Sequence, residues 1–158
     1  MGMDVEGILF YGFEVGDSDW ESPWATALGD DFDWEKLYLQ KMGFVPKNDL
    51  FTPEGEYRYQ EGTPEYIAAY KVWKADLAVE TSILDACPVT VFYHCSSDCP
   101  VWCVAIKEKY HQSSWGEAKK IVDLNVRPDS NNQLKKFCDL MGLEYADPNW
   151  YLVSYYST

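Results

Sequence analysis

Four stretches of the chain have the hydrophobic pattern of β-strands. Gly7 to Val15 is apolar on both faces and rich in aromatic residues, which predicts an interior strand covered on two sides. Val89 to Cys95 and Val101 to Lys107 alternate and contain many β-branched residues, and the short polar stretch Ser96 to Pro100 between them predicts an antiparallel hairpin. Trp150 to Tyr156 also alternates and predicts a strand at the C-terminal end of the chain.

Helical spacing of apolar residues recurs in other stretches. A first helix is predicted to begin at Asp31 or Asp33, either of which can cap it, and to end near Met42, before Gly43. A second begins at Thr63-Pro64-Glu65, because a threonine cap, a proline at the first helical position and an acid in the first turn all favour a helix start. Pro88 prevents it from continuing. Its expected apolar face consists of Ile67, Tyr70, Trp73 or Lys74, Leu77 and Leu84.

The last third of the chain contains one clear helix and one ambiguous stretch. The helix begins at Asp129 or Ser130 and ends at Gly142, with Leu134, Phe137, Cys138 and Met141 on one stripe. Within Tyr110 to Val126, Ser114 to Glu117 matches a helix-capping sequence, whereas Ile121 to Val126 alternates like a strand. We expect a turn followed by a short strand there.

Strands and helices are therefore segregated along the chain rather than strictly alternating. Gly16 to Asp30 and Val45 to Gly62 have neither period and are expected to be connections, the second with a short extended piece at Tyr57 to Tyr59. This order favours the α+β class, with a mainly antiparallel sheet of about four to five strands and three helices. We predict a single globular domain over residues 1–158.

The charge of the chain narrows the classes of partner. Among 158 residues, 26 are Asp or Glu and 13 are Lys or Arg, which gives a formal net charge of −13. This balance argues against nucleic acid or an anionic membrane as a direct partner. Apolar runs fall short of the roughly 20 residues that cross a bilayer, and the N-terminus is acidic where a signal peptide would be basic. We expect a cytoplasmic protein.

The excess charge is concentrated in the N-terminal part. Residues 1–65 contain 15 acids and 4 bases, whereas residues 66–158 contain 11 acids and 9 bases. Between Glu14 and Glu35 lie eight acids, no Lys or Arg, and several aromatic residues, whereas a solvated surface normally mixes both signs. Exposed aromatic residues beside carboxylates are typical of interaction hot spots and of sugar-stacking surfaces. The residues expected to bind are Asp17, Asp19, Trp20, Glu21, Trp24, Asp30, Asp31 and Asp33.

Cysteine and histidine residues gather in one stretch, His94-Cys95-x3-Cys99-x3-Cys103. Thiolates and imidazole are the ligands that zinc prefers, but the spacing lacks the Cys-x2-Cys pairs of structural zinc sites. Alternation sends His94 and Cys95 to opposite faces of one strand, which also argues against a nucleophilic cysteine activated by His94. We therefore predict no metal, no cofactor and no catalytic residue. The odd number of cysteines, five, argues against a set of disulfides.

Other catalytic motifs are missing from the sequence. It has no Gly-x-Ser-x-Gly elbow, no phosphate-binding glycine loop and no His-Glu-x-x-His. The two acidic runs at Asp17 and Asp31 begin like calcium loops, but they lack the glycine at position six and the glutamate at position twelve. A non-enzymatic role is therefore the expectation.

Three short blocks carry a resemblance to known proteins. They are Ile8-Leu-Phe-Tyr-Gly-Phe, His94-Cys-Ser-x-Asp-x-Pro-Val-Trp-Cys-Val-Ala-Ile and Pro148-Asn-Trp-Tyr-Leu-Val-Ser-Tyr-Tyr. The chain resembles small acidic proteins of bacteriophages and prophages, a set without an assigned activity. The resemblance implies an accessory protein of a mobile element, a class that includes inhibitors of host enzymes.

Two hypotheses of different classes follow. In the first, the segment Glu14 to Glu35 binds a basic surface of a nucleic-acid-binding host protein, because rows of carboxylates can imitate the phosphates of a duplex. In the second, the chain is a small hydrolase or zinc-dependent enzyme centred on His94, Cys95 and Cys99. The first is the leading hypothesis.

Overall fold

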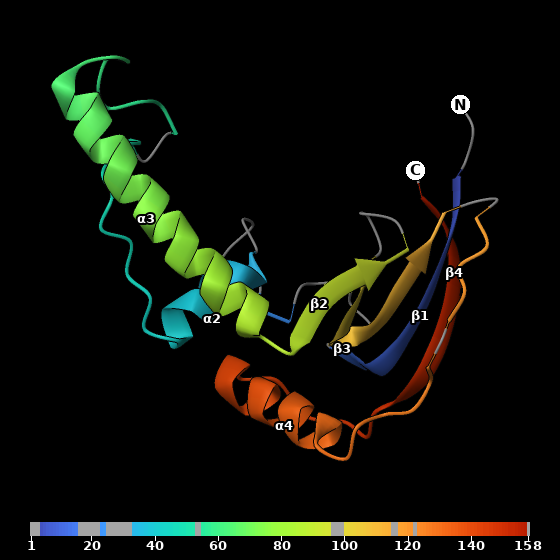
Figure 1. Ribbon diagram of the computed structural model, residues 1–158. Coiled ribbons are helices and arrows are strands. Elements are labelled where there is room, and N and C mark those ends of the chain that lie inside the picture. The colour runs from blue at the N-terminus through green and yellow to red at the C-terminus, as the bar shows by residue number, and fades with distance from the viewer. Residues whose placement is uncertain are drawn as a thin grey trace. The chain divides into compact units, whose positions relative to one another are not determined.

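A computed structural model of the chain describes residues 4–15, 23–24, 33–52, 55–95, 100–114, 117–121 and 123–157. The elements in these residues are β1 (Asp4–Val15), α2 (Trp34–Lys41), α3 (Pro64–Ala86), β2 (Val89–His94), β3 (Val101–Ser113), α4 (Ser130–Met141) and β4 (Asn149–Ser157), as labelled in Figure 1. The predicted α+β class is confirmed by these three helices and by a sheet of four strands.

The sheet is antiparallel and has the strand order β2-β3-β1-β4. β1 pairs with β3 on one side and with β4 on the other, which confirms the predicted interior strand. β2 and β3 form the predicted hairpin, in a register that runs from Val89 opposite Ile106 to His94 opposite Val101. The turn segment 96–99 lies outside the described residues.

β3 is longer than predicted because it bulges and then pairs again. Gly12 of β1 lies opposite Ala105, and Phe10 lies opposite Tyr110, so a single residue of β1 faces four residues of β3. A bulge of this kind bends a strand and changes the direction of its side chains. Here it leaves Lys109 buried, with 7% of its surface exposed.

Each face of the sheet has its own apolar packing. On one face Ile8, Phe10, Cys103 and Ala105 form a buried cluster. On the other face lies α4, because Tyr11, which points away from the Phe10 side, donates its hydroxyl to Asn131 at 2.9 Å. α4 contacts β2 and β3, as Figure 1 shows. Its predicted stripe is confirmed by the burial of Leu134, Phe137, Cys138 and Met141.

Glycines end two of the helices in the predicted manner. Gly43 follows α2 with φ 80°, and Gly142 follows α4 with φ 73°. After each glycine the next N–H donates to a carbonyl five residues back, from Phe44 to Leu39 and from Leu143 to Cys138, both at 2.9 Å. This is the Schellman arrangement, which satisfies the last carbonyls of a helix.

The chain forms two compact units, Met1–Trp34 with Cys87–Thr158, and Glu35–Ala86. The second unit contains α3 and all of α2 except Trp34. The single-domain expectation stays a prediction, since compact units can fold either together or separately.

No helix in the part of the chain that is described is both long and apolar enough to span a bilayer.

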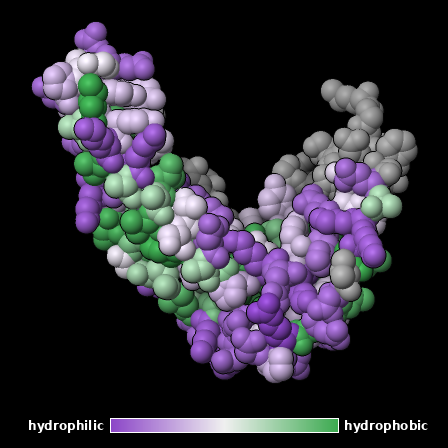
Figure 2. All heavy atoms as spheres, in the orientation of Figure 1, coloured by the Kyte–Doolittle hydropathy of each residue, from purple (hydrophilic) through white to green (hydrophobic). Residues whose placement is uncertain are grey.

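Two predictions about elements are wrong. The described residues among 121–126 form no strand, and the polar contacts of Asp123 and Asn125 explain why the alternation there does not pair. The apolar face expected on α3 is wrong for Ile67 and Leu77, which are exposed, whereas its members Tyr70, Trp73 and Leu84 are half-buried. Ala69 and Asp76, which were not expected on this face, are buried. In Figure 2 apolar side chains gather on the visible surface of this helix.

Candidate functional site

The predicted binding segment is only partly within the described residues. Trp24 and Asp33 are described, whereas Asp17, Asp19, Trp20, Glu21, Asp30 and Asp31 lie outside them, as does most of the connection Gly16 to Asp30. Asp33 directly precedes α2, at the position predicted for the start of this helix.

Trp24 does not have the exposure that was expected of an interaction anchor. It is 4% exposed, and its indole Nε1 donates to the carbonyl oxygen of Met141 at 3.0 Å. A buried tryptophan with a satisfied N–H stabilises the unit that surrounds it. The prediction that Trp24 is an exposed binding residue is therefore wrong.

A different group of aromatic residues lies at the surface of the second unit. We call it the tyrosine cluster. Ring centroids are 5.1 Å apart for Phe51 and Tyr57, 5.6 Å for Tyr57 and Tyr66, 5.9 Å for Tyr66 and Tyr70, and 5.4 Å for Tyr70 and Trp73. These separations are typical of favourable aromatic contacts, so the five rings form one continuous surface.

The geometry of α3 brings three members of the tyrosine cluster together. Tyr66, Tyr70 and Trp73 are spaced four and three residues apart, which places them on one face of a helix. The helix begins as predicted, with Pro64 as its first residue and with the Thr63 hydroxyl accepting from the N–H of Tyr66 at 3.3 Å.

The other two members come from the connection before α3. Phe51 and Tyr57 form an isolated antiparallel bridge, which holds their rings beside each other. Arg58 stabilises this part of the connection, because its Nε donates to the carbonyl oxygen of Asp49 at 3.0 Å. Tyr59 donates to the Asp49 carboxylate at 2.6 Å, and this hydrogen bond is the main cause of the raised pKa of Tyr59.

Asp76 ties this connection to α3. Its Oδ2 accepts from the backbone N–H of Lys47 at 2.7 Å, from that of Asn48 at 2.8 Å and from the Asn48 side chain at 3.1 Å. Burial raises the pKa of Asp76, but these hydrogen bonds together outweigh it and hold the pKa below its usual value. Asp76 is thus a buried carboxylate that fixes the backbone of the connection.

The tyrosine cluster is accessible, and charged residues of both signs lie near it in the sequence. Tyr57 is 58% exposed, whereas Phe51, Tyr66, Tyr70 and Trp73 are half-buried. Partial burial, together with its contact with Tyr57, raises the pKa of Tyr66. The exposed acids adjacent in sequence to the cluster are Glu56, Glu61 and Glu65, and the exposed cations are Arg58, Lys71 and Lys74. Lys74 lies over the Tyr70 ring, 5.2 Å from its centroid.

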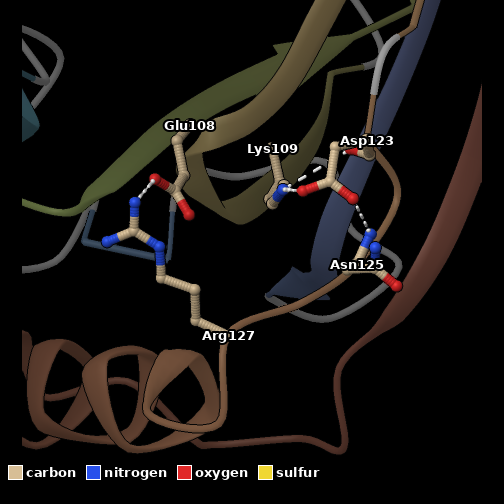
Figure 3. A network of polar contacts seen from close by, with 5 residues as sticks. All are labelled: Glu108, Lys109, Asp123, Asn125 and Arg127. Atoms are coloured by element: carbon tan, nitrogen blue, oxygen red, sulfur yellow. Dashed lines mark hydrogen bonds and ion pairs between the residues drawn. The ribbon is translucent and has the colours of Figure 1, made fainter.

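A polar pocket of about 370 Å³ lies beside the β3 bulge. Figure 3 shows that two ion pairs occupy its walls. Arg127 contacts Glu108 at 2.9 Å, and Lys109 Nζ contacts Asp123 Oδ2 at 3.4 Å. The backbone N–H of Asn125 and the Lys109 ammonium hold the pKa of Asp123 below its usual value. The pocket contains charges of both signs that already neutralise each other.

The cysteine stretch is arranged differently from the prediction. His94 ends β2, and its Nδ1 lies 3.1 Å from Cys95 Sγ, so these neighbours do not point to opposite faces. Cys99 lies outside the described residues. Where side chains are described, no three His, Cys, Asp or Glu residues are grouped so that they could hold a metal ion. The expectation of no metal and no cofactor stays a prediction.

Comparisons with protein-family models, with curated proteins and with solved structures found no match to this chain.

Sequence reasoning missed the tyrosine cluster for a specific reason. Tyr70 and Trp73 were recognised at helical spacing, but that spacing was interpreted as a buried face. The signal that could have found the cluster is the density of aromatic residues on both sides of the Thr63 start, because a connection that contains Phe51, Tyr57 and Tyr59 can place its rings against the first turns of the helix.

Proposed function

We propose that the protein is a non-enzymatic interaction module that binds the basic surface of a nucleic-acid-binding protein. One observation carries the proposal: an accessible cluster of aromatic rings spans the end of the acid-rich residues 1–65 and the first turns of α3. The resemblance to bacteriophage proteins adds the expectation that the partner is a host enzyme that acts on nucleic acid.

In this proposal, the negative charge of the chain attracts the basic partner over a long range. The 15 acids of residues 1–65 exceed the bases by 11, and those carboxylates that are described at Glu14, Glu35, Glu56 and Glu61 are exposed. A surface of one sign accelerates encounter with a surface of the opposite sign, and the effect weakens as salt rises. A groove that accepts phosphates through Lys and Arg would also accept such carboxylates.

The aromatic residues of the tyrosine cluster make the direct contacts in the bound complex. Tyrosine and tryptophan dominate interaction hot spots, because they bury a large area at a small cost in side-chain entropy. Tyr57 and Tyr66 are already held against each other and against their neighbours. Binding would therefore order few additional side chains, which favours slow dissociation.

Affinity capture from a bacterial lysate, followed by elution with duplex DNA, tests this function. The immobilised chain is expected to retain proteins that duplex DNA displaces, because DNA would compete for the same basic groove. Changing Tyr57 and Tyr66 together to Ala should abolish this DNA-sensitive capture. Tyr93→Ala is the matched control, since Tyr93 is 47% exposed but belongs to β2 in the other unit.

Two results would overturn the proposal. The first is a lysate from which no DNA-displaceable protein is retained. The second is equal capture by the double tyrosine variant and by the Tyr93→Ala control, with the circular dichroism spectra of both variants unchanged.

A further inference from the structure

The end of β2 carries a cysteine in an uncommon backbone conformation. Cys95 has a φ of 73°, in the left-handed region that residues other than glycine rarely adopt. The strand alternation is broken at this residue, and its thiol turns back toward the preceding side chain. Sγ of Cys95 and Nδ1 of His94 are 3.1 Å apart, which is within hydrogen-bonding range for sulfur.

An acid lies at the other nitrogen of the same imidazole. Glu14 of β1 places Oε1 3.8 Å from His94 Nε2. The sheet explains this approach, because Glu14 lies opposite Cys103 on β3 and Cys103 in turn lies opposite Phe92 on β2, two residues before His94. The thiol of Cys95 and the carboxylate of Glu14 therefore lie at the two different ring nitrogens of His94.

Burial differs among the three side chains. His94 is 6% exposed, whereas Cys95 is half-buried and the Glu14 side chain is 55% exposed. Desolvation lowers the pKa of His94, and the Glu14 charge offsets this only in part, so burial favours the neutral ring. In the tautomer that carries its proton on Nε2, the lone pair of Nδ1 faces the thiol and can accept its proton.

The other described cysteines lack this environment. Cys87, Cys103 and Cys138 are 2%, 0% and 0% exposed. Burial raises the pKa of the Cys103 thiol and raises that of Cys138 to about 11. Thiols of this kind are unreactive, since the thiolate is the nucleophile. They serve as internal controls within the same chain.

We propose that Cys95, His94 and Glu14 form a nucleophilic thiol site that accepts acyl groups from activated esters or thioesters. Sγ of Cys95 forms a bond to the carbonyl carbon, and the bond from that carbon to the leaving oxygen or sulfur breaks. The thiol proton passes to His94 Nδ1 and from there to the leaving group or to water. Glu14 is a positioning residue, whose charge lies 3.8 Å from Nε2 and stabilises the protonated ring.

The test uses p-nitrophenyl acetate as the acyl donor and iodoacetamide as a second electrophile. The full chain carries Cys99→Ser, so that Cys95 is compared only with the other described thiols. Mass spectrometry of peptides is expected to find the acetyl group on Cys95 together with an equal amount of released p-nitrophenolate. His94→Gln should slow both reactions by at least about tenfold, whereas His111→Gln, at the other histidine, should not.

Glu14 is tested through the pH profile of the alkylation rate. Among the described residues, the titratable groups that act on the site are Glu14 from β1 and Cys103 from β3, besides Cys95 itself. Removing the Glu14 charge destabilises the imidazolium, so Glu14→Gln should move the acidic limb of the profile to lower pH. A loss of structure alone would lower the rate without moving that limb.

The proposal is overturned if Cys95 reacts no faster than the buried Cys87, Cys103 and Cys138 in the native chain. Equal rates for His94→Gln and His111→Gln, in variants with native circular dichroism, would overturn it as well. Cys95→Ser must remove the acetylated peptide. If acetylation persists at another residue of that variant, the site is assigned wrongly.

Discussion

Gly12 allows β1 and β3 to approach each other at the bulge. A Cβ atom built on Gly12 would lie 1.9 Å from the carbonyl oxygen of Val104, and backbone cannot move aside as a flexible side chain can. We expect Gly12→Ala to destabilise the protein by about 3 kcal/mol, the upper part of the range for overpacking. Urea unfolding followed by tryptophan fluorescence measures this change.

Gly7→Ala is the matched control on the same strand, because nothing lies within 4 Å of a Cβ added there. Its effect should stay within about 1 kcal/mol. Equal losses at the two glycines would contradict the close approach of the strands at the bulge.

Asp76 links stability to pH in the second unit. Its pKa is lowered in the folded state, so it contributes stability above its unfolded pKa, and this is lost as pH falls through the folded value. Asp76→Asn should remove most of that pH dependence and weaken the hydrogen bonds at Lys47 and Asn48. Hydrogen exchange at these two amides, between pH 7 and pH 3, measures both effects.

Glu61→Gln is the control for Asp76, since Glu61 is an exposed acid of the same unit. If this variant loses protection at Lys47 and Asn48 to the same extent, Asp76 does not hold the connection.

At the scale of elements, the contribution of Gly142 to the C-terminal end of α4 can be tested. Gly142 has a φ of 73°, which costs an L-residue about 1 to 2 kcal/mol. Gly142→Ala should therefore lower stability by about 1 kcal/mol, and Gly142→Asn should lower it less, because asparagine tolerates the left-handed region. The melting temperatures of the two variants compare these costs.

Elements with strong local signals were predictable from the sequence. The hairpin followed from alternation in Val89 to Cys95 and Val101 to Lys107, and the limits of α3 followed from Thr63-Pro64 and Pro88. These signals depend only on neighbours in the chain, so they need no knowledge of the tertiary structure.

Elements that depend on distant contacts were not predictable. The bulge that extends β3 to Ser113 depends on how closely Gly12 approaches Val104, which no local pattern encodes. The expected strand at Ile121 to Val126 was lost because Asp123 pairs with the buried Lys109. The contact between His94 and Cys95 depends on one left-handed residue, where strict alternation predicted the opposite.

For the whole molecule, composition predicted the class of the proposed site but not its position. The excess of acids and aromatic residues was visible in the sequence. The prediction that Trp24 is an exposed aromatic binding residue was wrong, because Trp24 is buried. The tyrosine cluster depends on a connection folding back on a helix, and therefore on the hydrogen bonds of Asp76. The net charge can be counted from the sequence, whereas the exposure of a ring depends on the tertiary structure.

The acids of the segment Glu14 to Glu35 are predicted to bind the partner, and this can be tested by removing their charges. Changing Asp17, Asp19, Asp31 and Asp33 together to Asn should change stability by only about 0.5 kcal/mol for each residue, because the amide is nearly the same size as the carboxyl group and Asn preserves a helix cap. The matched control changes Glu117, Asp139, Glu144 and Asp147 to their amides, which removes the same number of charges from exposed acids elsewhere.

The most direct measurement is the association rate of each variant with the DNA-displaceable partner, at low and at physiological salt. We predict that the Asp17, Asp19, Asp31 and Asp33 variant associates about tenfold more slowly at low salt and with a weaker dependence on salt, while the control variant stays close to the unchanged protein. Equal rates for the two variants would contradict the account, because the acidity of the N-terminal segment would then have no directed role in binding.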